Sequence, residues 1–104
     1  MGLIQDNDYD GFDWDEGNRS KNFRKHGITD AEIEQVLLND PYFTSEDEKH
    51  SSEEPRVRIL GKTDAGKLVF AVYTIRGNLV RDIHARAMNR EERKQYDEAI
   101  KGNS

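Results

Sequence analysis

The chain has 104 residues, 34% of them hydrophobic and 36% charged, and its net charge is −5. A chain this short has room for one compact domain, because two smaller halves would each bury too little surface to fold alone. It contains no cysteine, which excludes disulfides, thiolate metal sites and a cysteine nucleophile. No apolar run approaches the roughly 20 residues of a membrane span, so we expect a cytoplasmic protein without membrane contact.

Acidic and basic residues are separated along the chain. Residues 1–18 carry a net charge of −6, and residues 29–54 carry −8. Residues 19–28, by contrast, carry +4, and residues 55–104 carry +5. A local basic surface can therefore form on a protein that is acidic overall, so an anionic ligand is compatible with the composition.

The N-terminal part of the chain predicts an arm, a strand and a helix. Residues 1–11 are acidic and have little to bury, so we expect a disordered arm ahead of a single domain of residues 12–101. Phe12–Trp14 alternates as a short strand does. A helix should follow, with Asp15 as its N-cap and Gly27 at its C-terminus.

A second helix is predicted by the capping-box spacing of Thr29 and Glu32. Its apolar side chains recur at helical spacing and form one face, namely Ile33, Val36 and Leu37. We expect this helix to end by Pro41. Residues 45–54 contain no apolar side chain, which predicts a mobile acidic loop.

Three β-branched or apolar segments then predict an antiparallel β-meander. The segments span residues 56–61, 67–75 and 79–87. Short turns at residues 64–66 and 76–78 separate them, at spacings that suit tight hairpins.

The C-terminal region predicts a last helix, because Asn89 and Glu92 repeat the capping-box spacing. Its residues at every fourth position are Met88, Glu92, Tyr96 and Ile100. We expect this helix to pack back on the sheet. The fold class is therefore α+β, with a short N-terminal strand and two helices, then the meander and a C-terminal helix.

The strand at residues 79–87 is the first candidate for a functional site. In an ideal strand one face carries Leu79, Arg81, Ile83, Ala85 and Ala87, and the other carries Val80, Asp82, His84 and Arg86. The second face is polar, which is typical both of a sheet face in contact with water and of a site for an anion.

Arginine recurs through the predicted strands, at Arg56, Arg58, Arg76, Arg81 and Arg86. Guanidinium groups suit bidentate contacts with phosphate. Ideal alternation places Arg81 and Arg86 on opposite faces, so the two share a pocket only if a bulge or a strand end reorients one of them.

Two histidines are candidates for proton transfer, because imidazole exchanges protons near neutral pH. His26 also has a structural interpretation as a residue of the helix C-terminus, whereas His84 lies on the polar face of its strand. His50 falls in the acidic loop and is expected to be solvated. The scattered histidines predict no metal site, and the absence of phosphate-loop and dinucleotide motifs predicts no nucleotide cofactor.

Two segments resemble the BrnT-type toxin family: FDWDEGNRSKNFRKHGI, and RVRILGKTDAGKLVFAVYTIRGNLVRDIHARAMNREERKQY. The motifs that carry the resemblance include Lys25-His26-Gly27, Tyr73-Thr74-x-Arg76-Gly77, Arg81-x-Ile83-x-Ala85-Arg86 and Glu92-x-x-x-Tyr96. The resemblance implies a RelE-like fold and a ribonuclease that cleaves RNA without a metal ion and so arrests translation. It also implies a hetero-oligomer with a BrnA-type antitoxin of the ribbon-helix-helix kind.

The roles implied by the resemblance fall on residues far apart in the sequence. Arg76, Arg81 and Arg86 would contact the phosphate or the transition state, and His84 stands where the family usually has serine. The residues expected to act in catalysis are Lys25, His26, Arg76, Arg81, His84 and Arg86, and those expected to bind the substrate are Arg56, Arg58 and Tyr96.

Three interpretations of function stay open at this point. The first is a metal-independent ribonuclease toxin, favoured by the family motifs and the arginines. The second is a catalytically weak or silent member that acts as a binding or co-repressor module with its antitoxin, which the acidic balance favours. The third is an interaction domain without a nucleic-acid role, which the acidic arm and loop favour. Cleavage of total RNA in EDTA discriminates the first from the other two.

Overall fold

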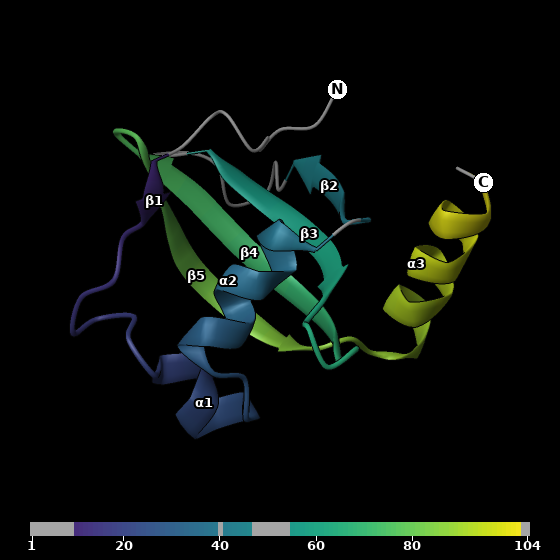
Figure 1. The fold of residues 1–104 in the computed structure, drawn as a ribbon, viewed down its shortest axis with the longest axis horizontal. Coiled ribbons are helices and arrows are strands. Elements are labelled where there is room, and N and C mark those ends of the chain that lie inside the picture. Colours follow the sequence, from purple (N-terminus) through teal and green to yellow (C-terminus); the bar gives the residue numbers. More distant parts are fainter. Residues whose placement is uncertain (1–9, 40, 47–54, 103–104) are drawn as a thin grey trace.

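The computed structural model describes residues 10–39, 41–46 and 55–102. Within them, five strands form one mixed sheet with the order β1-β5-β4-β3-β2, and three helices accompany it (Figure 1). The elements are β1 (Gly11–Phe12), α1 (Lys21–His26), α2 (Asp30–Leu38), β2 (Phe43–Glu46), β3 (Arg56–Lys62), β4 (Leu68–Arg76), β5 (Leu79–Ala87) and α3 (Arg90–Gly102). The predicted α+β architecture is confirmed. None of the helices in these ranges is long and apolar enough to cross a membrane.

The helix ends follow the capping signals of the sequence. The Thr29 amide donates to the Glu32 carboxylate and the Glu32 amide donates to the Thr29 hydroxyl, which starts α2. Asn89 and Glu92 form the same reciprocal pair at the start of α3. Gly27 ends α1 with a φ of 73°, a left-handed conformation that favours glycine.

The first helix starts later than the sequence predicts. It begins at Lys21, with Ser20 in the N-cap position, so the expectation that Asp15 caps it was wrong. The Asp15 carboxylate instead accepts a hydrogen bond from the Gly17 amide and two from Arg81 of β5. A long-range ion pair thus replaces the local cap.

The strand β2 was not predicted from the sequence. It spans Phe43–Glu46 and runs antiparallel to β3. Ser45 and Glu46, which were expected in the acidic loop, belong to this strand. The rest of that loop, residues 47–54, lies outside the described residues.

The first strand begins next to the expected N-terminal arm. Residues 1–9 lie outside the described residues. The Asp10 amide donates to the Asn78 carbonyl at 2.6 Å, and Gly11 pairs with Leu79 in the parallel contact of β1 with β5. The sheet therefore begins one residue earlier than expected.

The hydrophobic core lies between the sheet and the helices α1 and α2, which cross one of its faces (Figure 1). Its buried residues are Ile28, Ile33, Val36, Leu37, Val57, Ile59, Val69, Ala71, Tyr73, Val80 and Ala85. The Tyr73 hydroxyl donates to the Ile33 carbonyl at 2.7 Å, so its polar end is satisfied inside the core. The opposite face of the sheet, turned away from α1 and α2, is called the outer face below.

A β-bulge in β5 decides which of its side chains reach the outer face. Val72 pairs with His84, and the next residue of β4, Tyr73, pairs with Asp82, so Ile83 is the extra residue. Because Tyr73 points into the core, Asp82 turns inward as well, whereas His84 turns outward with Val72. The expectation that Asp82 and His84 share one polar face was therefore wrong.

Candidate functional site on the outer face

The strand register aligns side chains in rows across the outer face. One row holds Arg56, Thr74 and Arg81, the next holds Arg58, Val72 and His84, and the third holds Leu60, Phe70 and Arg86. The bulge thus places Arg81 and Arg86 on the same face, which regular alternation would not do. Arg76 follows at the exposed end of β4, opposite Leu79.

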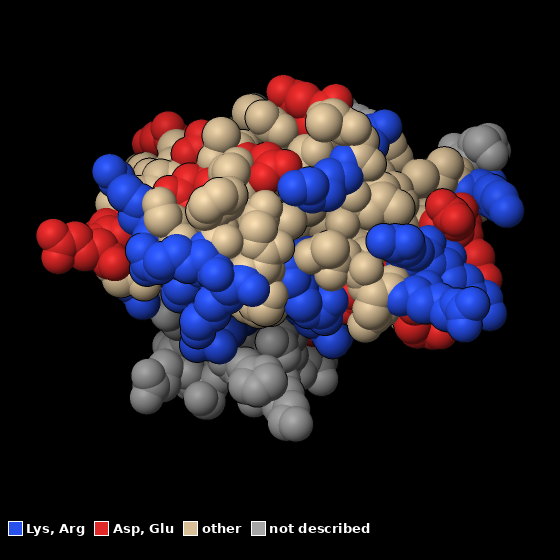
Figure 2. Space-filling view, turned by 90° about the horizontal axis from the view of Figure 1, so that it is seen from below, with Lys and Arg blue, Asp and Glu red and all other residues tan. Residues whose placement is uncertain are grey.

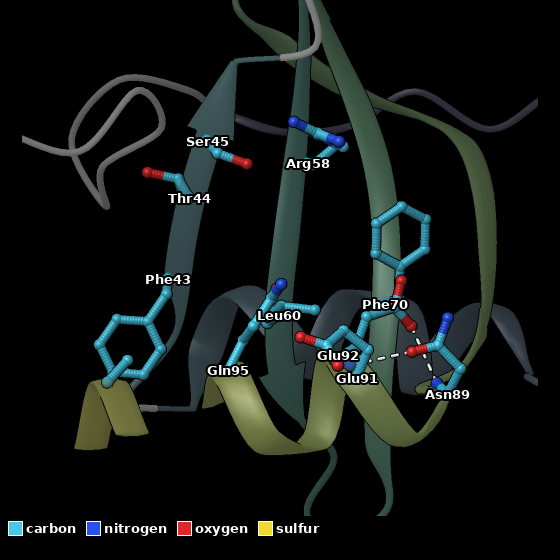
Figure 3. Close-up of a pocket in the computed structure, with 11 residues that line it drawn as sticks. Phe43, Thr44, Ser45, Arg58, Leu60, Phe70, Asn89, Glu91, Glu92 and Gln95 are labelled. Carbon is cyan, nitrogen blue, oxygen red and sulfur yellow. Dashed lines mark hydrogen bonds between the residues drawn. The ribbon is translucent and has the colours of Figure 1, made fainter. Parts of the chain in front are cut away.

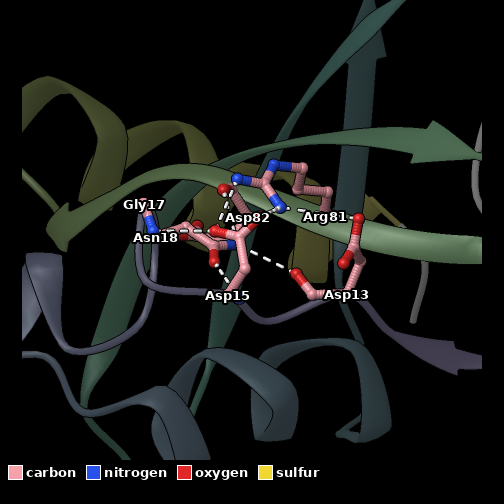
Figure 4. A network of polar contacts seen from close by, with 6 residues as sticks. All are labelled: Asp13, Asp15, Gly17, Asn18, Arg81 and Asp82. Carbon is pink, nitrogen blue, oxygen red and sulfur yellow. Dashed lines mark hydrogen bonds and ion pairs between the residues drawn. The ribbon is translucent and has the colours of Figure 1, made fainter.

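Arg81 is held by two aspartates of the segment between β1 and α1 (Figure 4). Its Nη1 lies 2.8 Å from Asp15 Oδ2 and 3.5 Å from Asp13 Oδ2, and its Nη2 donates to Asp15 Oδ1 at 3.0 Å. The hydrogen bond from Arg81 is the main cause that lowers the pKa of Asp15 to about 2. Since only 12% of the Arg81 side chain is exposed, its guanidinium is committed to fastening this segment to β5.

Asp82, on the inner side of β5, connects the strand to α1. The Asn22 amide group donates to Asp82 Oδ2, and Asn22 Oδ1 accepts from the Ala85 amide at 3.0 Å. Burial raises the pKa of Asp82 to about 6, against the opposing effects of Asn22 and Lys21. Asn22 and Asp82 therefore fix the position of α1 beside the edge of the sheet.

This placement brings two histidines into contact. The ring centroids of His26, at the end of α1, and His84, on β5, lie 5.2 Å apart with perpendicular planes. Burial lowers the pKa of His84, and the neighbouring charges of His26, Arg86, Lys21 and Lys25 lower it further. At neutral pH the imidazole of His84 is therefore uncharged and able to accept a proton.

Arg86 lies beside this histidine pair and touches an aromatic ring. Its guanidinium carbon sits 4.3 Å from the centroid of the Phe70 ring, and that ring is 6.4 Å from the ring of His84. Nη1 and Nη2 of Arg86 contact the two carboxylate oxygens of Glu92 at 2.7 and 2.9 Å. Burial opposes ionisation of Glu92, but hydrogen bonds from Arg86 and the Asn89 amide keep its pKa below the ordinary value.

A groove of about 460 Å³ lies between the outer face and α3 (Figure 3). Its walls include Leu60 and Phe70 from the sheet and Gln95 from α3. Tyr96 does not line it. The Tyr96 side chain is 2% exposed, its hydroxyl donates to the Pro41 carbonyl at 2.9 Å, and its ring packs edge-on against Phe43. Tyr96 therefore holds α3 against the fold.

The space-filling view shows how the charges are distributed (Figure 2). On the face seen there, lysine and arginine gather in several groups, while acidic residues lie along the upper side, at the left end and among the basic residues at the right. The basic residues in the last turn of α1 are Arg24, Lys25 and His26. An acidic chain thus presents local positive surface, as its charge segregation predicts.

The sequence-predicted site residues separate into two groups. Lys25, His26, His84 and Arg86 come together at the end of α1 and the outer face of β5. Arg76, Arg81 and Tyr96 lie apart from this cluster, and Arg56 and Arg58 occupy neighbouring rows. Two members, Phe70 and Glu92, were missed as site residues. The sequence signals only their local roles in a strand and a helix cap, and neither signal indicates contact with Arg86.

Together, the fold and this cluster define a small α+β domain whose outer sheet face carries arginines and which holds the imidazoles of His26 and His84 in contact. The family of the ribonuclease toxin BrnT of type II toxin–antitoxin systems matches residues 14–92, and the chain belongs to that family. As a type II toxin, it has a protein antitoxin as its partner. Among curated proteins, none matches the chain significantly.

Proposed function

We propose that the protein is an endoribonuclease that cleaves RNA without a metal ion and so arrests translation. The contact of His26 with His84, with Arg86 two residues further along β5, is the observation that carries this proposal. Metal-free cleavage needs a base, an acid and a cation, and this cluster offers side chains for all three roles. The cognate antitoxin is proposed to be of the BrnA type.

The reaction begins with the 2′-hydroxyl next to the scissile phosphate. His84 takes its proton, because burial and neighbouring cations keep this imidazole neutral. The 2′-oxygen then bonds to phosphorus and the bond from phosphorus to the 5′-oxygen breaks. His26 gives a proton to the departing oxygen. The products are a 2′,3′-cyclic phosphate and a 5′-hydroxyl.

Arg86 stabilises the negative charge that develops on the phosphate oxygens. Its bidentate pair with Glu92 shows a guanidinium already oriented for two parallel contacts, and a phosphate offers the same geometry. Binding of RNA exchanges the carboxylate of Glu92 for phosphate while Arg86 stays over Phe70. Lys25 adds positive charge from the end of α1.

The arginines outside the cluster take other roles in this proposal. Arg81 has a structural role, because Asp15 and Asp13 occupy its guanidinium. Arg56 and Arg58 lie on the same face and bind the RNA further from the scissile bond. Arg76 lies at the hairpin end of β4, far along the sheet from Arg86, and contacts the RNA backbone there.

The test uses protein purified away from its antitoxin and incubated with total RNA in EDTA. Wild type is expected to cleave and to leave 2′,3′-cyclic phosphate ends, and Arg86→Ala is expected to lose cleavage. Arg90→Ala removes an exposed arginine at the start of α3 and serves as the matched control. Intact RNA with wild type would contradict the proposal.

A catalytically silent binding module is the second candidate, because a carboxylate already neutralises Arg86. Under that alternative, the protein leaves RNA intact and still forms a tight complex with its antitoxin. The proposed antitoxin is tested in either case by coexpressing this chain with the product of a neighbouring gene that encodes a small ribbon-helix-helix protein. The two proteins are expected to copurify. If they do not, the BrnA-type assignment is contradicted.

A further inference from the structure

The groove between the outer face and α3 adjoins the proposed catalytic cluster through one side chain. Phe70 lines the groove, and its ring also contacts the guanidinium of Arg86. In Figure 3, Leu60 and Phe70 belong to strands of the sheet and Glu91 and Gln95 belong to α3, and all four line the groove. A volume of about 460 Å³ with an apolar floor and a polar rim suits a ligand of nucleotide size.

We propose that this groove is the subsite for a guanine base of the RNA, an inference that rests on the proposed ribonuclease function. A nucleotide whose phosphate contacts Arg86 has its base within reach of Phe70, because the base, sugar and phosphate are covalently joined. Phe70 and Leu60 supply the apolar surface on which a base stacks. Stacking alone tolerates every base, so the choice of base depends on the polar rim.

Two charged side chains of the rim favour guanine. Arg58 lines the groove from β3, at the end away from α3 in Figure 3, and Glu91 lines it from α3. Guanine presents two acceptors, O6 and N7, that match a guanidinium, and its N1 and N2 groups are donors that match a carboxylate. Adenine places an amino donor where guanine has O6, so Arg58 would face a donor.

Three charged side chains line the groove, Arg58, Glu91 and Glu92, and Glu92 is paired with Arg86. One guanidinium beside two carboxylates suits a neutral base better than an anionic group. Pyrimidines lack N7 and fill less of the space between the sheet and α3. Guanine is therefore the base that uses both rim groups and the stacking surface at once.

The experiment measures nucleotide binding separately from cleavage. Guanosine 3′-monophosphate and adenosine 3′-monophosphate are titrated into the full chain, and amide chemical shifts are followed by NMR. The guanosine nucleotide is expected to bind about tenfold more tightly and to shift signals of β3, β4 and α3 around the groove. Arg58→Met and Glu91→Gln are each expected to reduce that preference by about tenfold.

Two exposed residues of α3 outside the groove provide matched controls, Arg90→Met and Glu98→Gln, which are expected to keep the preference. Equal affinities for the two nucleotides, or shifts confined to other surfaces, would overturn the guanine subsite. RNA that is cleaved without preference for guanine would overturn it as well while leaving the ribonuclease intact. Guanosine-selective binding by a protein that cleaves no RNA would support the subsite and contradict the ribonuclease.

Discussion

Replacing the buried carboxyl of Asp82 by an amide is expected to stabilise the protein in a pH-dependent way. Burial raises the pKa of Asp82 from 3.8 to about 6, which corresponds to a cost of roughly 3 kcal/mol for the charged form. The neutral carboxyl makes its full contribution to the free energy of unfolding below pH 3.8. That contribution is lost as the pH rises through about 6. Asp82→Asn stays neutral throughout and still accepts a hydrogen bond from Asn22.

The free energy of unfolding of Asp82→Asn and wild type is measured by urea denaturation between pH 4 and pH 7.5. The variant's advantage over wild type is expected to grow by roughly 2.4 kcal/mol across this interval. The pKa shifts of the other carboxyls are common to both proteins, so they cancel in the difference between the two free energies of unfolding. Asp97→Asn, at an exposed position of α3, is the control and should change stability by less than about 0.5 kcal/mol. A difference that stays constant with pH, or falls, would refute this account of Asp82.

Three further predictions concern the roles proposed for charged side chains. Arg81→Ala should lower the melting temperature because it removes the ion pair with Asp15. Variant protein that circular dichroism shows to be folded should still cleave RNA at the wild-type rate. Loss of cleavage by folded protein would instead indicate that Arg81 acts in catalysis. Glu92→Gln preserves the helix cap but removes the charge opposite Arg86, so the affinity for labelled RNA should rise about two- to fivefold at low salt. Glu98→Gln, the same change elsewhere on α3, should not raise it, and equal affinities of the two variants would count against the exchange at Arg86. Lys25→Met removes a charge that lowers the pKa of His84, so the acidic limb of the pH–rate profile should move to higher pH; an unmoved limb would argue against His84 as the base.

The sequence predicts the elements of this fold better than it predicts their contacts. The capping residues at Thr29 and Asn89 were identified because such signals act within one helical turn. Asp15 was misassigned because its partner, Arg81, lies 66 residues away. A local cap and a long-range ion pair require the same side chain, and the sequence does not reveal which prevails.

For the candidate site, the sequence indicated residue types but not their arrangement. Arginine in the strands and histidine at Lys25-His26-Gly27 indicated residue types suited to phosphate chemistry. The bulge at Ile83 could not be predicted, because a one-residue insertion in a strand has no distinct pattern in a single sequence. That bulge turns Asp82 inward and His84 outward, and so determines the composition of the cluster.

The most direct measurement is the RNA cleavage rate in EDTA for His26→Ala, His84→Ala and the double variant. Since the two imidazoles are proposed to work as one acid–base unit, each single variant should lose at least about 100-fold in rate. The double variant should then be hardly slower than either single one. A folded variant of either histidine that cleaves at the wild-type rate would contradict the account.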